Sequence, residues 1–272
     1  MMLGPHRRRT DVPERRFRRG VYLLPSLMTL GNLFCGYACV IYAMRGEYAV
    51  AAPFVGIAMV LDTLDGRIAR MTGTTSEFGV QFDSMADIIS FGIAPAILTF
   101  SWGLTALGNW GWAAGFVYVT AAAMRLARFN IQASSHGDKR YFVGMPSPAA
   151  ATVPASTIFA YPSGFQEPIG AIPVLALVLV PAFLMVSTIK FRSFKTFDLQ
   201  ARRSYTVLLV LASLIAFVSA HPALALVTLS YGYMLSAFVE MLYARWHHGK
   251  AEVVAAPNVY EHKPKSKLES EI

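Results

Sequence analysis

Four aspartates lie close together in the sequence, within or beside strongly apolar segments. The chain contains seven aspartates, and four of them fall within 26 residues: Asp62, Asp65, Asp83 and Asp87. A carboxylate inside a membrane costs roughly 2.5–3.5 kcal/mol on insertion scales. Neighbouring carboxylates also repel one another. The cluster therefore needs bound cations or protons to compensate its charge. It is the first candidate for a catalytic or metal-binding site.

The ligand types in this cluster indicate which metal it would hold. Carboxylate oxygens without a histidine or cysteine among them favour a hard cation such as Mg²⁺ or Mn²⁺. Two such cations held by shared carboxylates form a site for displacement at phosphorus, because they bridge phosphate oxygens and stabilise developing charge. One carboxylate can stay free as a base.

Helical spacing places these residues on two stripes. On a helix over 49–70, residues three or four apart share one face. That face carries Asp62, Asp65, Gly66, Ala69 and Arg70. On a helix over 79–101, the corresponding face carries Gly79, Asp83 and Asp87. The short loop 71–78 lets the two helices pack antiparallel, so both stripes can face one cavity. The small residues leave room for a ligand, and Arg70 suits a phosphate oxygen.

The composition indicates the class of protein to which these two helices belong. The chain has 272 residues, of which 55% are hydrophobic and 15% are charged. Its mean hydropathy is +0.45. A soluble domain carries about 25% charged residues, and a disordered chain needs low hydrophobicity. Two cysteines exclude a disulfide scaffold. What remains is a polytopic membrane protein.

Apolar segments long enough to cross a bilayer predict an all-α bundle of about eight transmembrane helices. They cover 24–44, 49–70, 79–101, 110–130, 147–164, 169–189, 204–220 and 222–243. Of the 24 lysines and arginines, Arg45 alone falls in the loops predicted to lie outside. By the positive-inside rule, both termini and the aspartate cluster are expected on the cytoplasmic side. The net charge of +8 therefore indicates orientation rather than a nucleic-acid partner.

These segments also define the expected organisation of the chain. Residues 1–20 form a basic juxtamembrane segment, 21–250 form the membrane domain, and 251–272 form a disordered polar tail. The arginines of 1–20 either rest on anionic headgroups or serve only to orient the first helix.

The spacing from Asp62 to Asp87 reads D-x-x-D-G-x-x-A-R-x8-G-x3-D-x3-D. It resembles, without a departure, the signature of the CDP-alcohol phosphatidyltransferases. The resemblance implies an integral membrane enzyme, usually a homodimer, that displaces CMP from a CDP-linked lipid or head group with an alcohol. By position it implies that Asp62, Asp65 and Asp83 are metal ligands. It also implies that Asp87 is the general base and touches a metal.

The remaining signature positions concern the nucleotide. The resemblance implies that Gly66, Ala69 and Gly79 line its space and that Arg70 neighbours its diphosphate. Thr29 and Asn32, one turn apart on the first helix, either bond to nucleotide or lipid phosphate or bond to another helix.

Four segments, which extend beyond the signature residues, narrow the resemblance to one subfamily. They are LPSLMTLGNLFCG (24–36), TGTTSEFGVQFDSMADIISFGIAPA (72–96), RLARFN (125–130) and YFVGMPSPAAA (141–151). They are similar to bacterial and archaeal phosphatidylserine synthases of the membrane-embedded type, which usually have asparagine where Ser26 stands. The substrates implied are CDP-diacylglycerol and L-serine, and the implied location is a prokaryotic cytoplasmic membrane.

A serine acceptor carries a carboxylate, which a guanidinium fork binds well. Arg125 and Arg128 lie three residues apart at the inner end of the helix over 110–130, with Asn130 close by. The resemblance implies that these three residues form the serine site. The alternative is that the arginines only anchor the helix at the headgroup level.

Two other functions stay open at this point. The same family includes enzymes that use choline, glycerol phosphate, inositol phosphate or a second lipid as the alcohol. A cation transporter would also carry intramembrane carboxylates, but it would not explain Gly66, Ala69, Arg70 and Gly79 at their spacing.

Overall fold

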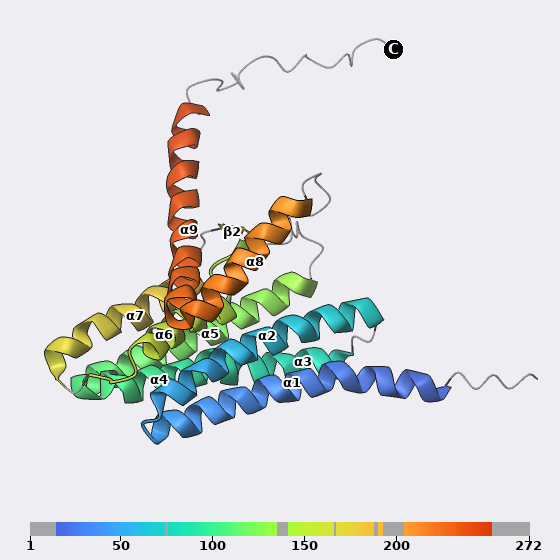
Figure 1. Cartoon of the computed structure of the whole chain (residues 1–272), viewed down its shortest axis with the longest axis horizontal. Helices are drawn as coiled ribbons and strands as arrows, with labels where there is room; N and C mark the ends of the chain where they lie inside the picture. Colours follow the sequence, from blue (N-terminus) through green and yellow to red (C-terminus); the bar gives the residue numbers. More distant parts are fainter. Residues whose placement is uncertain are drawn as a thin grey trace, which may run out of the picture.

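Long helices laid side by side make up most of the computed structural model (Figure 1). The structure describes residues 15–73, 76–134, 141–165, 167–187, 190–192 and 204–251. The α-helices are α1 (Arg15–Met44), α2 (Tyr48–Thr72), α3 (Glu77–Asp87), α4 (Ala94–Trp102), α5 (Asn109–Ser134), α6 (Ser147–Ala160), α7 (Pro168–Val186), α8 (Ser204–Ala220) and α9 (Pro222–Ala251). A π-helix, η1 (Ile88–Ile93), joins α3 to α4, and a 3₁₀ turn, η2 (Leu104–Leu107), follows α4.

Four helical stretches in the described part of the chain are long and apolar enough to cross a membrane. They are Ser26–Met44, Tyr48–Thr72, Glu77–Trp102 and Pro168–Val186. The other predicted segments coincide with α5, α6, α8 and α9, but a total of eight crossings and the orientation of the termini stay predictions. Residues 15–20 of the predicted juxtamembrane segment belong to α1, whereas 1–14 and the tail from 252 lie outside the described residues.

The helical prediction misses one small element. Strands β1 (Tyr141–Val143) and β2 (Lys190–Arg192) pair antiparallel, with Phe142 opposite Phe191. They join the segment before α6 to the segment after α7. Three-residue strands are too short to produce a recognisable alternating pattern, so the sequence alone does not reveal them.

The helices pack through small side chains. Helix α1 runs along α2 and also contacts α3, η1 and α4, while α6 contacts α2, α4, α7 and α9. Alanines at these contacts are buried and let the helix backbones approach closely; examples are Ala43, Ala51, Ala58, Ala122 and Ala151. Figure 1 shows α9 running across the direction of the other helices, with its C-terminal end beyond them.

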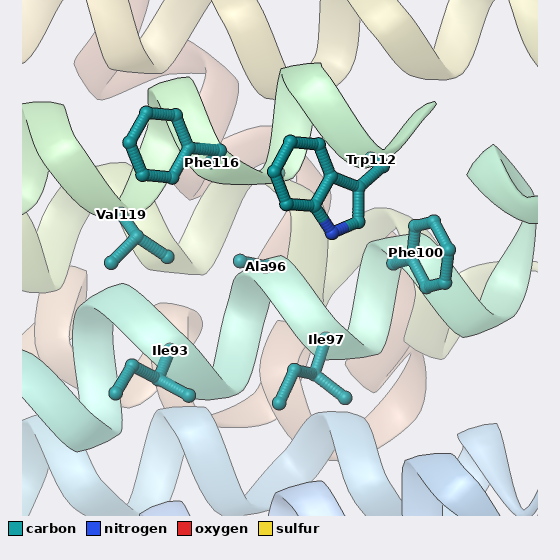
Figure 2. Close-up of a pocket in the computed structure, with 8 residues that line it drawn as sticks. Ile93, Ala96, Ile97, Phe100, Trp112, Phe116 and Val119 are labelled. Atoms are coloured by element: carbon teal, nitrogen blue, oxygen red, sulfur yellow. The ribbon is translucent and has the colours of Figure 1, made fainter. Parts of the chain in front are cut away.

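An apolar pocket of about 260 Å³ lies between the η1–α4 stretch and α5 (Figure 2). Its lining consists of Ile93, Ala96, Ile97, Phe100, Trp112, Gly115, Phe116 and Val119. None of these side chains carries a charge, and the aspartates do not line it. The pocket suits hydrocarbon and is not a place for phosphate chemistry.

The π-helix follows Asp87 directly and is anchored to α1. Ser90 is fully buried, and its Oγ donates a hydrogen bond to the Asn32 carbonyl at 2.8 Å. Gly36, one turn further along α1, faces the same serine. A Cβ added at Gly36 would lie 2.6 Å from Ser90 Oγ and 2.9 Å from Ser90 Cα. Glycine therefore permits the close approach that fixes the helix turn after Asp87.

This approach gives the first testable prediction. We expect Gly36→Ala to lower the free energy of unfolding by about 1–3 kcal/mol, because an extra methyl group must displace the backbone of η1. Gly56→Ala on α2 is the matched control, since a Cβ there meets nothing within 4 Å. The control variant gains helix propensity without a clash. Melting temperatures of the purified proteins in detergent should therefore fall for Gly36→Ala only, and equal values would contradict the close packing.

Candidate active site

Three of the four aspartates converge from two helices. Asp62 on α2 and Asp83 and Asp87 on α3 each offer a carboxylate oxygen, and these oxygens lie within 4.8 Å of one another. All three side chains are partly buried. Helix α3 begins at an N-cap, where Ser76 Oγ accepts a hydrogen bond from the Gly79 amide at 3.0 Å. The helix thus begins at Glu77, nearly two turns before Asp83.

The fourth aspartate is held differently. Asp65 is 6% exposed and accepts a hydrogen bond from Thr29 Oγ1 on α1. It lies outside the group of three carboxylates, although it is close enough to interact electrostatically with Asp62 and Asp83. Its assignment as a metal ligand stays a prediction.

Two buried oxygen atoms beside the cluster lack partners. Asn32 Nδ2 on α1 donates to Asp87 Oδ1 at 3.2 Å. Asn32 Oδ1 and Asp83 Oδ1 are buried and have no hydrogen-bond partner among the described residues. Leaving a buried polar atom unsatisfied costs about 1–3 kcal/mol. An all-oxygen donor set with unsatisfied atoms and mutually repelling carboxylates fits a hard divalent cation.

Arg125 lies next to these carboxylates. This α5 side chain is partly buried, and it interacts electrostatically with Asp87 and Asp62. Its Nη1 donates to Ser147 Oγ at the start of α6, at 2.8 Å. The guanidinium also lies 5.4 Å from the centre of the Phe129 ring. Arg125 is thus a fixed positive group at the edge of the acidic cluster.

The other two predicted serine-site residues connect helices. Arg128 Nη1 donates to the carbonyl of Val186, the last residue of α7, at 3.2 Å. Terminal carbonyls of a helix lack intrahelical partners, so this contact stabilises the end of α7. Asn130 Nδ2 donates to Ser84 Oγ on α3 at 3.0 Å. The structure brings Arg125 to the carboxylates and gives Arg128 and Asn130 contacts between helices.

The residues predicted for the nucleotide leave open space along α2. Arg70 is exposed, and its Nε donates to the Gly66 carbonyl at 2.6 Å. A Cβ at Gly66 would meet only Arg70 Nη2, at 3.7 Å. Ala69 and Gly79 are half-buried. Thr29 and Asn32, both on α1, donate hydrogen bonds to Asp65 on α2 and Asp87 on α3. These are contacts between helices, which is one of the two roles expected for this pair. Contacts of all six residues with a nucleotide stay predictions.

Sequence reasoning did not single out two residues that support the site. Ser84 and Ser90 bond to neighbouring helices. The signal for Ser84 and Ser90 is weak: each is a small polar residue on a helix of the site.

Taken together, the site combines an acidic cluster that could hold a metal ion, an adjacent guanidinium and open space beside Gly66 on α2. Such a site can hold a phosphate group by cations and place an anionic or hydroxyl-bearing partner beside it. A carboxylate of the cluster can also accept a proton from that partner.

Comparison with known proteins agrees with this chemistry. The sequence profile described as CDP-alcohol phosphatidyltransferase matches residues 22–189. A Helicobacter pylori (strain J99) protein named CDP-diacylglycerol–serine O-phosphatidyltransferase is 36% identical over 180 residues, which cover 64% of this chain and 74% of the relative. A Bacillus subtilis protein of the same name is 34% identical over 172 residues, covering 63% and 91%.

An archaeal relative is similar over a comparable length of the chain. The archaetidylserine synthase of Methanothermobacter thermautotrophicus is 34% identical over 170 residues, covering 62% of this chain and 69% of the relative. The resemblance predicted from the sequence is therefore confirmed. Helices α8 and α9 lie beyond the matched residues 22–189.

Proposed function

The chain belongs to the CDP-alcohol phosphatidyltransferase family, and from this premise we propose that it transfers a phosphatidyl group from CDP-diacylglycerol to the hydroxyl of L-serine. The products are phosphatidylserine and CMP. The observation that carries the proposal is the convergence of Asp62, Asp83 and Asp87 beside Arg125. Relatives of this chain are named for the same reaction or for its archaeal counterpart.

The donor binds along α2 and α3. Asp62, Asp65, Asp83 and Asp87 hold two divalent cations, Mg²⁺ or Mn²⁺. Divalent cations held there would offset the negative charge that develops on the phosphate oxygens during displacement. Arg70 donates to the diphosphate, and the nucleotide lies against Gly66, Ala69 and Gly79; a Cβ at Gly66 would meet only Arg70 Nη2, at 3.7 Å. The acyl chains stay in the lipid.

The acceptor enters from the cytoplasm. Arg125 binds its carboxylate, because a guanidinium matches a carboxylate in both charge and shape. Asp87 takes the proton of the serine hydroxyl as that oxygen attacks the β-phosphorus, which bears the lipid. A new oxygen–phosphorus bond forms, the bond to CMP breaks, and CMP leaves with the bonding electrons.

The location follows from the same premise. The apolar helices and the membrane-enzyme relatives mark an integral membrane protein. We place it in a prokaryotic cytoplasmic membrane, with the site on the cytoplasmic face, and as a homodimer. The concentration of basic residues on one predicted side supports this orientation.

An acceptor assay tests the proposed function. Membranes containing the protein are incubated with CDP-diacylglycerol and Mn²⁺ or Mg²⁺, and CMP release is measured with serine, choline, glycerol phosphate or inositol phosphate. We expect release that depends on serine and on the added metal, and phosphatidylserine as the lipid product. Release with another alcohol in place of serine would assign a different acceptor. Metal flux into proteoliposomes without lipid turnover would instead indicate a transporter.

A further inference from the structure

Two contacts between α5 and the stretch formed by α3 and η1 fix where Arg125 lies along the site. Near the end of α5, Asn130 Nδ2 donates to Ser84 Oγ at 3.0 Å. Earlier on α5, Ala122 Cβ would lie 3.3 Å from a Cβ added at Gly92. The two stretches therefore run in opposite directions, and Arg125 is level with the residues between Ser84 and Gly92. The last aspartate of the cluster lies among those residues.

The Arg125 guanidinium is held by the start of α6. Its Nη1 donates to Ser147 Oγ at 2.8 Å, and its central carbon lies 5.4 Å from the centre of the Phe129 ring. Ser147 is 3% exposed, so water has little access to this hydrogen bond. A hydrogen bond to a charged group contributes about 1.5–3 kcal/mol. Since a guanidinium has five N–H donors, this bond fixes one arm of the fork and uses only one of them.

The segment before Ser147 fixes the position of its hydroxyl group. Gly144 has a φ of +86°, and a Cβ there would clash with the Met185 carbonyl oxygen at the end of α7. Met145 is fully buried, and its amide donates to the Leu184 carbonyl at 3.0 Å. The end of α7 thus holds the chain that leads into α6. Main-chain contacts therefore place the Ser147 side chain where it meets the guanidinium.

We propose that Ser147 positions the Arg125 guanidinium for the carboxylate of the acceptor. The inference rests on the proposed function, because it takes the acceptor to be serine. A hydroxyl oxygen is neutral, so it accepts a hydrogen bond without cancelling the positive charge of the guanidinium. That charge stays available for an anionic group of the substrate. Ser147 acts through Arg125 and is a positioning residue, not a catalytic one.

Steady-state kinetics of the full chain in membranes test this role. Ser147→Ala removes only the hydroxyl group, and we expect the KM for serine to rise roughly tenfold, which corresponds to about 1.4 kcal/mol. The KM for CDP-diacylglycerol and the kcat at saturating serine should stay within about twofold, since only acceptor binding is affected.

Two further variants show whether the hydroxyl group itself is responsible. Ser147→Thr keeps a hydroxyl, and its KM for serine should lie within about threefold of the wild type. Ser147→Cys carries a thiol, which accepts hydrogen bonds only weakly, so its KM should rise in the same direction as that of Ser147→Ala. The cysteine variant replaces the alanine variant in the comparison if the latter does not fold, as judged from melting temperatures.

Ser156→Ala is the matched control, because it removes a buried hydroxyl from the same helix that shares a hydrogen bond of 2.7 Å with Ser230 instead. Its KM for serine should equal that of the wild type. An unchanged KM in Ser147→Ala and Ser147→Cys would overturn the inference, and so would an equal rise in Ser147→Thr or Ser156→Ala, which would indicate a general effect of packing. A wild-type protein without serine-dependent CMP release would refute the proposed function, and this inference with it.

Discussion

Asp87→Asn should reduce CMP release by roughly a hundred- to ten-thousand-fold, which is the usual contribution of a positioned general base. The substitution keeps the shape of the side chain, and the amide oxygen can still accept the hydrogen bond that Asn32 Nδ2 gives to Asp87. An amide does not take up the proton of the serine hydroxyl at neutral pH. Binding of CDP-diacylglycerol should persist, because Asp62 and Asp83 still hold a cation. Single-turnover CMP release and equilibrium binding of the nucleotide lipid measure the two effects separately.

The control for this experiment is a carboxylate away from the cluster. Glu47 is exposed and lies in the connection between α1 and α2, at the opposite end of α2 from Asp62. Glu47→Gln removes the same charge and should leave CMP release within about twofold of the wild type, as surface substitutions usually do. An Asp87→Asn protein with full activity would show that another group accepts the proton.

Asp83→Asn is expected to weaken metal-dependent activity and, without metal, to raise the melting temperature. Asp83 Oδ1 is buried without a hydrogen-bond partner among the described residues, and its carboxylate lies close to those of Asp62 and Asp87. Loss of an outer-shell partner alone costs roughly 10–100-fold in metal affinity, so loss of a ligand should cost at least about 100-fold. The concentration of Mn²⁺ or Mg²⁺ that gives half-maximal activity should rise accordingly.

The same substitution removes one of the mutually repelling charges. In the presence of EDTA, the melting temperature of Asp83→Asn should therefore lie above that of the wild type, because less like-charge repulsion remains at the site. Wild-type activity should vanish in EDTA and return on addition of the metal. An Asp83→Asn protein with unchanged metal dependence would contradict the assignment of this carboxylate as a ligand.

The approach of Asp62, Asp83 and Asp87 could be predicted from the sequence because it depends on local geometry. Helical periodicity sets the two stripes, and the short connection between the helices forces them to pack antiparallel. The partner of Asp65 could not be predicted in the same way. Whether Thr29 reaches Asp65 depends on the rotation of α1 about its own axis, which is set by close contacts such as that of Gly36 with Ser90.

The arginines also show which features could be predicted from the sequence and which could not. The sequence places Arg125 and Arg128 on one side of α5, but it does not tell which helix end lies opposite each side chain. In the structure Arg128 meets the last carbonyl of α7, whereas Arg125 meets Ser147. The contact of α9 with α6 joins residues 74 positions apart. Nothing in the sequence of either helix indicates which other helix it contacts. Predictions from spacing therefore succeed within a hairpin and fail between distant helices.

The order of residues along the chain has a consequence for biosynthesis. All four aspartates lie in α2 and α3, whereas Arg125 lies in α5. During translation the acidic hairpin thus leaves the ribosome before the helix that carries its neighbouring cation. Until α5 is inserted, the cost of holding these carboxylates in the bilayer must be met by protons, divalent ions or the insertion machinery. Until that point the four carboxylates lack the positive side chain that lies beside them in the folded protein.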